Sequence, residues 1–353
     1  MKKYLLIVAA LFTAVTFNAQ TITIDGANAD WAEVPMLTEP GVSPVVKMIV
    51  PQTGVTLPEG TAYCLMVTGD NAPILAGYPV IYTDADMDAS TKTEDLWICP
   101  AMGSDYQMAT WSSGSLFAEN EGKDIREMAI MQSAFSGIAF SGSFGAWLTF
   151  NWGDLYIPTD PGTEGWKWSE STYHPLMVKP YSYKNLNGTL AAAETYATHQ
   201  ALAPGDALDM TNGYANAVLM WASWTVELTT PAKYDITANI TSGNSASVDL
   251  KLVNIATNEV AASFTSGDLA GGSAVAVGEW DLSAVPAGKY MLRFSNHVEW
   301  SEMKLNSITL TAQGATGINN VTATSKAQKE IRDGQLIIRR DGKTFNAVGA
   351  EIK

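Results

Sequence analysis

The chain has few of the side chains that metal sites and nucleophilic catalysis require. It contains only two cysteines, Cys64 and Cys99, and three histidines, His174, His199 and His297. The histidines lie far apart in the sequence, and no HExxH, GxSxG or Cys/His arrangement assigns a role to any of them. The sequence therefore gives no support for a zinc site built from these residues or for a known nucleophile motif.

Basic residues are also scarce, and they are unevenly distributed. The formal net charge is −15; residues 21–313 hold 12 basic and 32 acidic side chains, whereas residues 314–353 hold seven and four. An acidic body repels nucleic acid and anionic lipid, and it suits neutral ligands or divalent cations. We therefore expect no nucleic-acid partner.

Apolar runs long enough to span a bilayer are missing as well. The longest run near the start, Tyr4–Val15, follows Lys2 and Lys3 and precedes a short polar stretch ending at Gln20. This layout predicts a secretory signal peptide over residues 1–20, and no cysteine follows it to accept a lipid. We expect an exported protein without an integral membrane segment, either secreted or at the cell surface (outer membrane-associated), with the periplasm as an alternative.

The oxidising compartment leaves two structures open for the cysteines. It favours a disulfide between Cys64 and Cys99. Both residues also lie in apolar, strand-like stretches, AYCLMV and DLWICP, where a buried free thiol fits equally well.

Alternation of apolar and polar residues dominates the body, as at Ile236, Ala238 and Ile240, with Gly, Asn, Ser and Pro between the runs. Only Lys123–Met131 and, more weakly, Leu190–Thr198 look helical. The pattern predicts an all-β protein with two β-sandwich (jelly-roll-like) domains, at residues 21–185 and 186–313. Two Asp-Gly turns in residues 314–353 predict a linker followed by a small C-terminal β-meander.

The first domain opens with the segment TITIDGANADWAEVP at Thr21–Pro35. This segment resembles the start of family 9 carbohydrate-binding modules and the related DOMON domains, through Ile24, Asp25, Gly26, Asp30 and Trp31. Trp31 either fills the core behind the first turn or stacks on a ligand. Its large apolar area favours the core.

The second domain resembles the family 6 and family 35 carbohydrate-binding modules. The matching elements are Ala193–Tyr196 (AETY), Gly213–Tyr214 and Trp221–Leu228 (WASWTVEL). The resemblance implies a ligand site in the loops that join the sheets, with contacts from Tyr214, Trp221, Asn296 and Trp300. A buried role for Trp221 is the alternative, and Trp224 is assigned to the core because it begins an alternation with Val226 and Leu228.

Aromatic residues also gather in loops of the first domain, where Trp111, Trp166 and Trp168 are further candidates for carbohydrate binding. Residues two apart in an extended strand point the same way, so Trp166 and Trp168 can form a platform for sugar rings. The same rings can instead cover the junction between the domains.

An acidic turn in the first domain is the best candidate for a metal site. Asp84, Asp86, Asp88, Ser90 and Asp95 occupy positions one, three, five, seven and twelve of a loop. No helices flank it and Ala89 replaces the glycine of an EF-hand, so an EF-hand is rejected. A structural Ca²⁺ site and a solvated acidic turn are the two remaining interpretations.

The last residues, KEIRDGQLIIRRDGKTFNAVGAEIK, resemble the C-terminal segment of exported Bacteroidetes proteins that is related to type IX secretion sorting domains. The resemblance implies secretion or surface-attachment machinery as a partner. The segment is shorter than a full sorting domain.

Together these features predict a secreted or surface-associated, non-catalytic protein that binds a polysaccharide or glycoprotein glycan by aromatic stacking. We do not expect an enzyme, because no sequence segment identifies a pair of carboxylates at glycosidase spacing. The alternatives are a structural adhesin or surface-layer component, a polysaccharide-degrading hydrolase, and a haem-binding DOMON variant with Met and His ligands.

Overall fold

The computed structural model divides the chain into two compact units, Met1–Gln313 and Gly314–Lys353. It describes residues 20–38, 40–41, 43–69, 80–84, 96–98, 116–122, 124–135, 144–150, 155–157, 176–198, 202, 204–210, 221–242, 246–296, 301–314, 328–332, 335–340, 343–346 and 351–352. Every described element is a β-strand or a 3-10 helix of three or four residues. The predicted all-β class is therefore confirmed.

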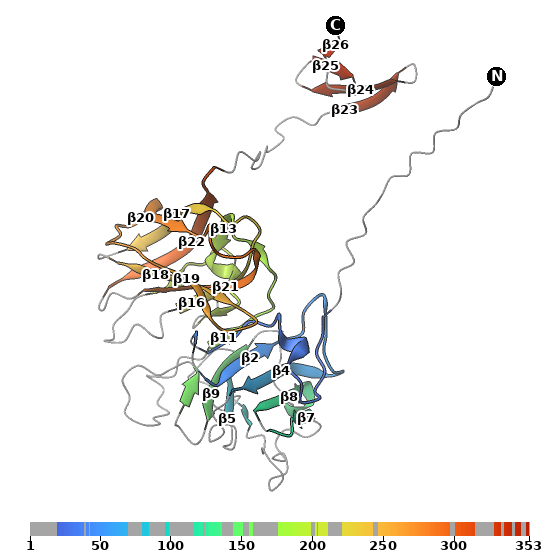
Figure 1. Cartoon of the computed structure of the whole chain (residues 1–353), viewed down its shortest axis with the longest axis vertical. Coiled ribbons are helices and arrows are strands. Elements are labelled where there is room, and N and C mark those ends of the chain that lie inside the picture. The colour runs from blue at the N-terminus through green and yellow to red at the C-terminus, as the bar shows by residue number, and fades with distance from the viewer. Residues whose placement is uncertain are drawn as a thin grey trace, which may run out of the picture. The chain divides into compact units, whose positions relative to one another are not determined.

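A four-stranded antiparallel sheet lies in the first unit (Figure 1). Its strands, in spatial order, are β2 (Val45–Ile49), β4 (Thr61–Thr68), β8 (Ile125–Met131) and β7 (Leu116–Glu119). A short parallel pair, β1 (Gln20–Thr21) with β3 (Val55–Thr56), lies outside this sheet, and the 3-10 helix η1 spans Ala29–Trp31.

A second sheet has eleven strands. Its path runs through β19 (Val260–Thr265), β18 (Val248–Asn254), β21 (Gly288–Asn296), β16 (Trp221–Leu228), β14 (Ala197–Thr198), β11 (Leu176–Val178), β9 (Phe144–Phe150), β5 (Val80–Asp84) and β6 (Leu96–Ile98). Two strands branch from the path: β10 (Leu155–Ile157) pairs with β9, and β12 (Lys184–Asn185) pairs with β16. Two further 3-10 helices are described: η3 (Gln132–Phe135) directly follows β8, and η4 (Ala192–Glu194) precedes β14.

The third sheet packs against part of the second to form a sandwich. Its strands are β13 (Gly188–Ala191), β22 (Met303–Ala312), β17 (Lys233–Ser242) and β20 (Gly272–Asp281), with β15 (Leu208–Asp209) on β22. The inward-facing apolar residues of both sheets make one core, to which Trp224, Val226 and Leu228 belong. The predicted core position of Trp224 is confirmed.

The eleven-stranded sheet continues across the expected domain boundary near residue 185. Strand β11 pairs with β9 on one side and with β14 on the other, so strands from before and after the boundary share one ladder of hydrogen bonds. We call residues 21–185 the first half and residues 186–313 the second half of this unit.

The expected helix over Lys123–Met131 is wrong, because Ile125–Met131 forms strand β8. Six of its seven residues are buried, and β8 lies between β4 and β7. A strand covered on both faces lacks the alternation that identifies a half-exposed strand, so the periodicity did not reveal it. The weaker helix over Leu190–Thr198 is also wrong: this stretch holds the end of β13, helix η4 and strand β14.

Cys64 is a buried free cysteine on β4, and burial raises the pKa of its thiol to about 12. The free-thiol alternative therefore applies to Cys64, while Cys99 lies outside the described residues. Within the described part of the chain, no helix has the length and apolar character needed to cross a membrane.

The second unit is a four-stranded antiparallel meander. Its strands are β23 (Gln328–Arg332), β24 (Gln335–Arg340), β25 (Lys343–Asn346) and β26 (Glu351–Ile352). Arg332 pairs with Gln335, and Arg340 pairs with Lys343, so two residues separate the strands at each Asp-Gly position. The predicted hairpins and meander are confirmed.

Candidate functional site

The opening motif of the first half is organised around one buried carboxylate, that of Glu127 on β8. Its Oε2 accepts hydrogen bonds from the backbone N–H groups of Asp25 (2.9 Å) and Gly26 (2.6 Å). Its Oε1 accepts one from Trp31 Nε1 at 2.5 Å. Burial raises the pKa of Glu127, and these three hydrogen bonds oppose that shift.

Packing requires the glycine and the tryptophan of this motif. Gly26 has φ +81°, and a Cβ there would lie 2.8 Å from the carbonyl carbon and oxygen of Glu119. Trp31 is fully buried and packs in a cluster with Val34 and Cys64. The core role of Trp31 is confirmed, so the motif has a structural function. Glu127 was missed in the sequence, although an acid in the apolar stretch IREMAIM was a signal for it.

Asn296 lies at the end of β21 and is fully buried. Its Nδ2 donates hydrogen bonds to the backbone oxygen of Met210 (2.8 Å) and to Ser301 Oγ (2.7 Å). Asn296 therefore links Met210, which precedes segment 211–220, to Ser301, which follows segment 297–300. The described contacts give it a role in positioning chain ends, and its contact with a ligand stays a prediction.

Strand register brings the ends of several elements together at this point. Trp221, the first residue of β16, pairs with Ser295, and Val248, the first residue of β18, pairs with Asn296. Tyr214 and Trp300 belong to the two segments that start or finish here, but both lie outside the described residues. The described strand ends that adjoin these segments are the first residue of β16 and the last residue of β21, with the first residue of β18 paired beside them; we call these strand ends the base.

Trp221 is buried at the start of β16. It is only 4% exposed, and the guanidinium carbon of Arg293 lies 3.8 Å from the centre of its ring. Arg293 Nη1 also donates a hydrogen bond to the backbone oxygen of Thr38, in the first half, at 3.3 Å. The alternative of a buried role applies: Trp221 forms a cation–π contact at the junction of the halves.

A buried lysine at the same junction was not expected from the sequence. Lys47 on β2 is 5% exposed. Its Nζ donates to the backbone oxygens of Trp31 (2.9 Å) and of Ile255 (3.0 Å), which belongs to the second half. Burial lowers the pKa of Lys47 to about 8, because removal from water disfavours the ammonium form.

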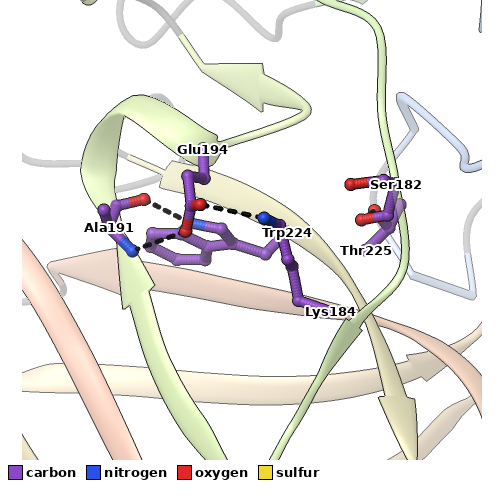
Figure 2. Close-up of polar contacts among 6 residues, drawn as sticks. All are labelled: Ser182, Lys184, Ala191, Glu194, Trp224 and Thr225. Carbon is purple, nitrogen blue, oxygen red and sulfur yellow. Dashed lines mark hydrogen bonds and ion pairs between the residues drawn. The ribbon is translucent and has the colours of Figure 1, made fainter. Parts of the chain in front are cut away.

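The segment AETY forms a turn at the start of the second half (Figure 2). Glu194 Oε1 binds Lys184 Nζ at 2.9 Å, and its Oε2 accepts the backbone N–H of Ala191 at 3.2 Å. Trp224 Nε1 donates to the Ala191 oxygen at 2.8 Å, and Thr225 Oγ1 donates to the Ser182 oxygen at 2.9 Å. The hydrogen bond from Lys184 lowers the pKa of Glu194. These contacts secure the chain where it enters the second sandwich.

The remaining candidate residues are three tryptophans and four aspartates of the first half. Trp111, Trp166, Trp168, Asp86, Asp88 and Asp95 lie outside the described residues, and Asp84 is the last residue of β5. Among the residues that are described, no group of three or more His, Cys, Asp or Glu side chains could hold a metal ion. The calcium turn and the tryptophan platform therefore stay predictions.

Comparison with known proteins adds little to this description. No family model matches the chain, and no curated protein matches it. Among solved structures, a glycoside hydrolase family 43 arabinoxylan arabinofuranohydrolase from Bacillus subtilis, in complex with cellotetraose, matches with 10% identity and a TM-score of 0.27. The match covers 76% of this chain and 52% of that chain, so this chain spans about half the enzyme's length. A TM-score this low carries no argument about activity.

Proposed function

We propose that this chain is an exported, non-catalytic protein that binds a neutral glycan at the base formed by the ends of β16, β18 and β21. The observation that supports this proposal most is the pair of hydrogen bonds from the buried Asn296 amide to Met210 and Ser301. These two residues adjoin the segments that contain Tyr214 and Trp300. Aromatic residues that are held in place before binding stack on sugar rings with little loss of conformational freedom, and we propose this role for Tyr214 and Trp300.

The charge distribution supports a neutral ligand. Residues 21–313 hold 32 acidic and 12 basic side chains, a balance that disfavours acidic polysaccharides and leaves neutral sugars as the better partners. The ligand class we propose is a polysaccharide or a glycoprotein glycan. The resemblances to family 9 and to family 6 and 35 carbohydrate-binding modules support the same class.

The two ends of the chain support its proposed location. We propose that residues 1–20 direct export and that residues 314–353 contact secretion or surface-attachment machinery, as the resemblance to type IX sorting segments implies. Calcium at Asp84–Asp95 is part of the proposal as a structural ion only.

Affinity electrophoresis against a panel of polysaccharides tests the binding site. At least one polysaccharide should retard the wild-type protein, and Tyr214→Ala and Trp300→Ala should weaken binding by about 1 to 3 kcal/mol each. Leu116→Ala, which removes an exposed apolar side chain of the first half, is the control. Equal retardation of all four proteins would exclude these two residues from the site.

A structural adhesin or surface-layer component is the second candidate, and the sheet that continues through both halves favours it. A protein of this kind would be retarded by no polysaccharide, yet its deletion would change attachment of the cell surface to solid material.

Hydrolysis is tested separately by measuring the release of reducing sugar from the same polysaccharide panel. If extensively purified protein still releases reducing sugar, the protein is an enzyme and the non-catalytic proposal is refuted.

A further inference from the structure

Two buried cations cross the junction between the halves in opposite directions. Lys47, on β2 of the first half, donates to the Ile255 backbone oxygen of the second half at 3.0 Å. Arg293, on β21 of the second half, donates to the Thr38 backbone oxygen of the first half at 3.3 Å. The two side chains are 5% and 4% exposed. Each half therefore supplies a desolvated cation to a carbonyl group of the other half.

Apolar contacts and backbone hydrogen bonds accompany these two cations. Met36 of the first half packs with Val253, Ile255 and Met291 of the second in one buried cluster. The turn after β18 also enters this junction, because the Asn258 oxygen accepts the backbone N–H of Gly41 at 2.9 Å.

A hydrogen bond and a strand pairing also connect the two halves beside the eleven-stranded sheet. Tyr196 is buried beside β14, and its hydroxyl donates to the Met48 backbone oxygen on β2 at 2.6 Å. The β11–β14 pairing then carries the sheet from one half to the other. The junction therefore combines a shared sheet, a shared apolar cluster and polar contacts in both directions.

We propose that Lys47 and Arg293 form a reciprocal latch, which holds the two halves in one arrangement and makes residues 20–313 a single cooperative folding unit. A buried cation without an acceptor is far more costly than a misplaced apolar group. Rotation or sliding of one half against the other would take Ile255 away from Lys47, which would keep only Trp31 of its own half, or would take Thr38 away from Arg293. The latch therefore selects a single arrangement, and the halves do not act as modules joined by a hinge.

Calorimetry combined with hydrogen exchange on the full chain tests this proposal. The wild-type body should unfold in one transition whose calorimetric and van't Hoff enthalpies agree. Amide groups of β4, in the first half, and of β17, in the second, should then show equal protection, because both halves open together. Peptides from residues 328–352 identify the separate contribution of the C-terminal unit.

The double variant Lys47→Met/Arg293→Met removes both donors and keeps side chains of similar length. It should separate the protection of β4 and β17 by at least about tenfold, or split the transition in two. Lys289→Met is the matched control. It removes the ion pair between Lys289 Nζ and Glu33 Oε2, which are 2.6 Å apart across the same junction. The Lys289 and Glu33 side chains are 38% and 54% exposed. This control should keep one transition, since an exposed ion pair contributes little.

Two results would overturn the proposal. One is a wild-type body that already unfolds in two independent transitions, a measurement that needs no variant. The other is a double variant that folds and keeps one transition with equal protection of both halves. If the double variant fails to fold while the control folds normally, the requirement for the latch is supported.

Discussion

Raising the pH from 7 to 9 should stabilise the body of this protein through Lys47. Its pKa is lowered from 10.5 to about 8 in the folded protein because the ammonium group is buried. Well below pH 8 the lysine is protonated in both the folded and the unfolded state, so it does not make the free energy of unfolding depend on pH. Between pH 8 and 10.5 the unfolded state holds one more proton, and the free energy of unfolding rises with pH.

The size of the effect follows from the two pKa values. The slope is about 1.4 kcal/mol per pH unit where only the unfolded state is protonated, and the integrated gain between pH 7 and 9 is about 1.3 kcal/mol. Other groups also respond. Cys64, whose pKa is raised to about 12, opposes the gain near pH 9, and Lys179, whose pKa is lowered by burial, adds to it.

Comparison of the wild type with Lys47→Met isolates the lysine, because the other groups are present in both proteins. Chemical denaturation of each protein at pH 7 and pH 9 gives four free energies of unfolding. The pH-dependent gain should be about 1.3 kcal/mol larger in the wild type than in Lys47→Met. Gains that agree within about 0.3 kcal/mol would show that Lys47 keeps an ordinary pKa in the folded protein, and the burial argument would fail.

Three further predictions concern stability. Gly26→Ala should destabilise the protein by about 2 kcal/mol or more in denaturant titration, because the added Cβ meets the backbone of Glu119. Gly54 has a similar φ of +82° but open space around it, so Gly54→Ala should cost only about 1 kcal/mol. Equal losses in the two variants would exclude the contact with Glu119. Glu127→Ala should cost about 3 kcal/mol or more, because three donors, two of them buried, lose their acceptor, while Glu121→Ala on the exposed hairpin should be nearly neutral. Deletion of residues 314–353 should leave the melting temperature of the body unchanged, because they form a separate compact unit; loss of folding would refute that independence.

Local patterns in the sequence were enough to predict the fold class and several elements. The alternation at Ile236, Ala238 and Ile240 lies within β17, since side chains of a half-exposed strand point alternately to the core and to solvent. The Asp-Gly pairs predicted the two hairpins of the meander, because glycine accepts positive φ without steric conflict. Trp31 and Trp224 were assigned correctly to cores, because rings of this size are most stable when buried.

Contacts between distant residues decided the rest. Strand β8 looked helical because it is covered on both faces, and that covering comes from other parts of the chain. The partners of Glu127 are 96 to 102 residues away, and the hydrogen bond from Lys47 to Ile255 spans 208 residues. A single sequence contains no local signal for such pairs, so only the tertiary structure could show that Trp221 and Arg293 lie at a junction and that Asn296 is buried.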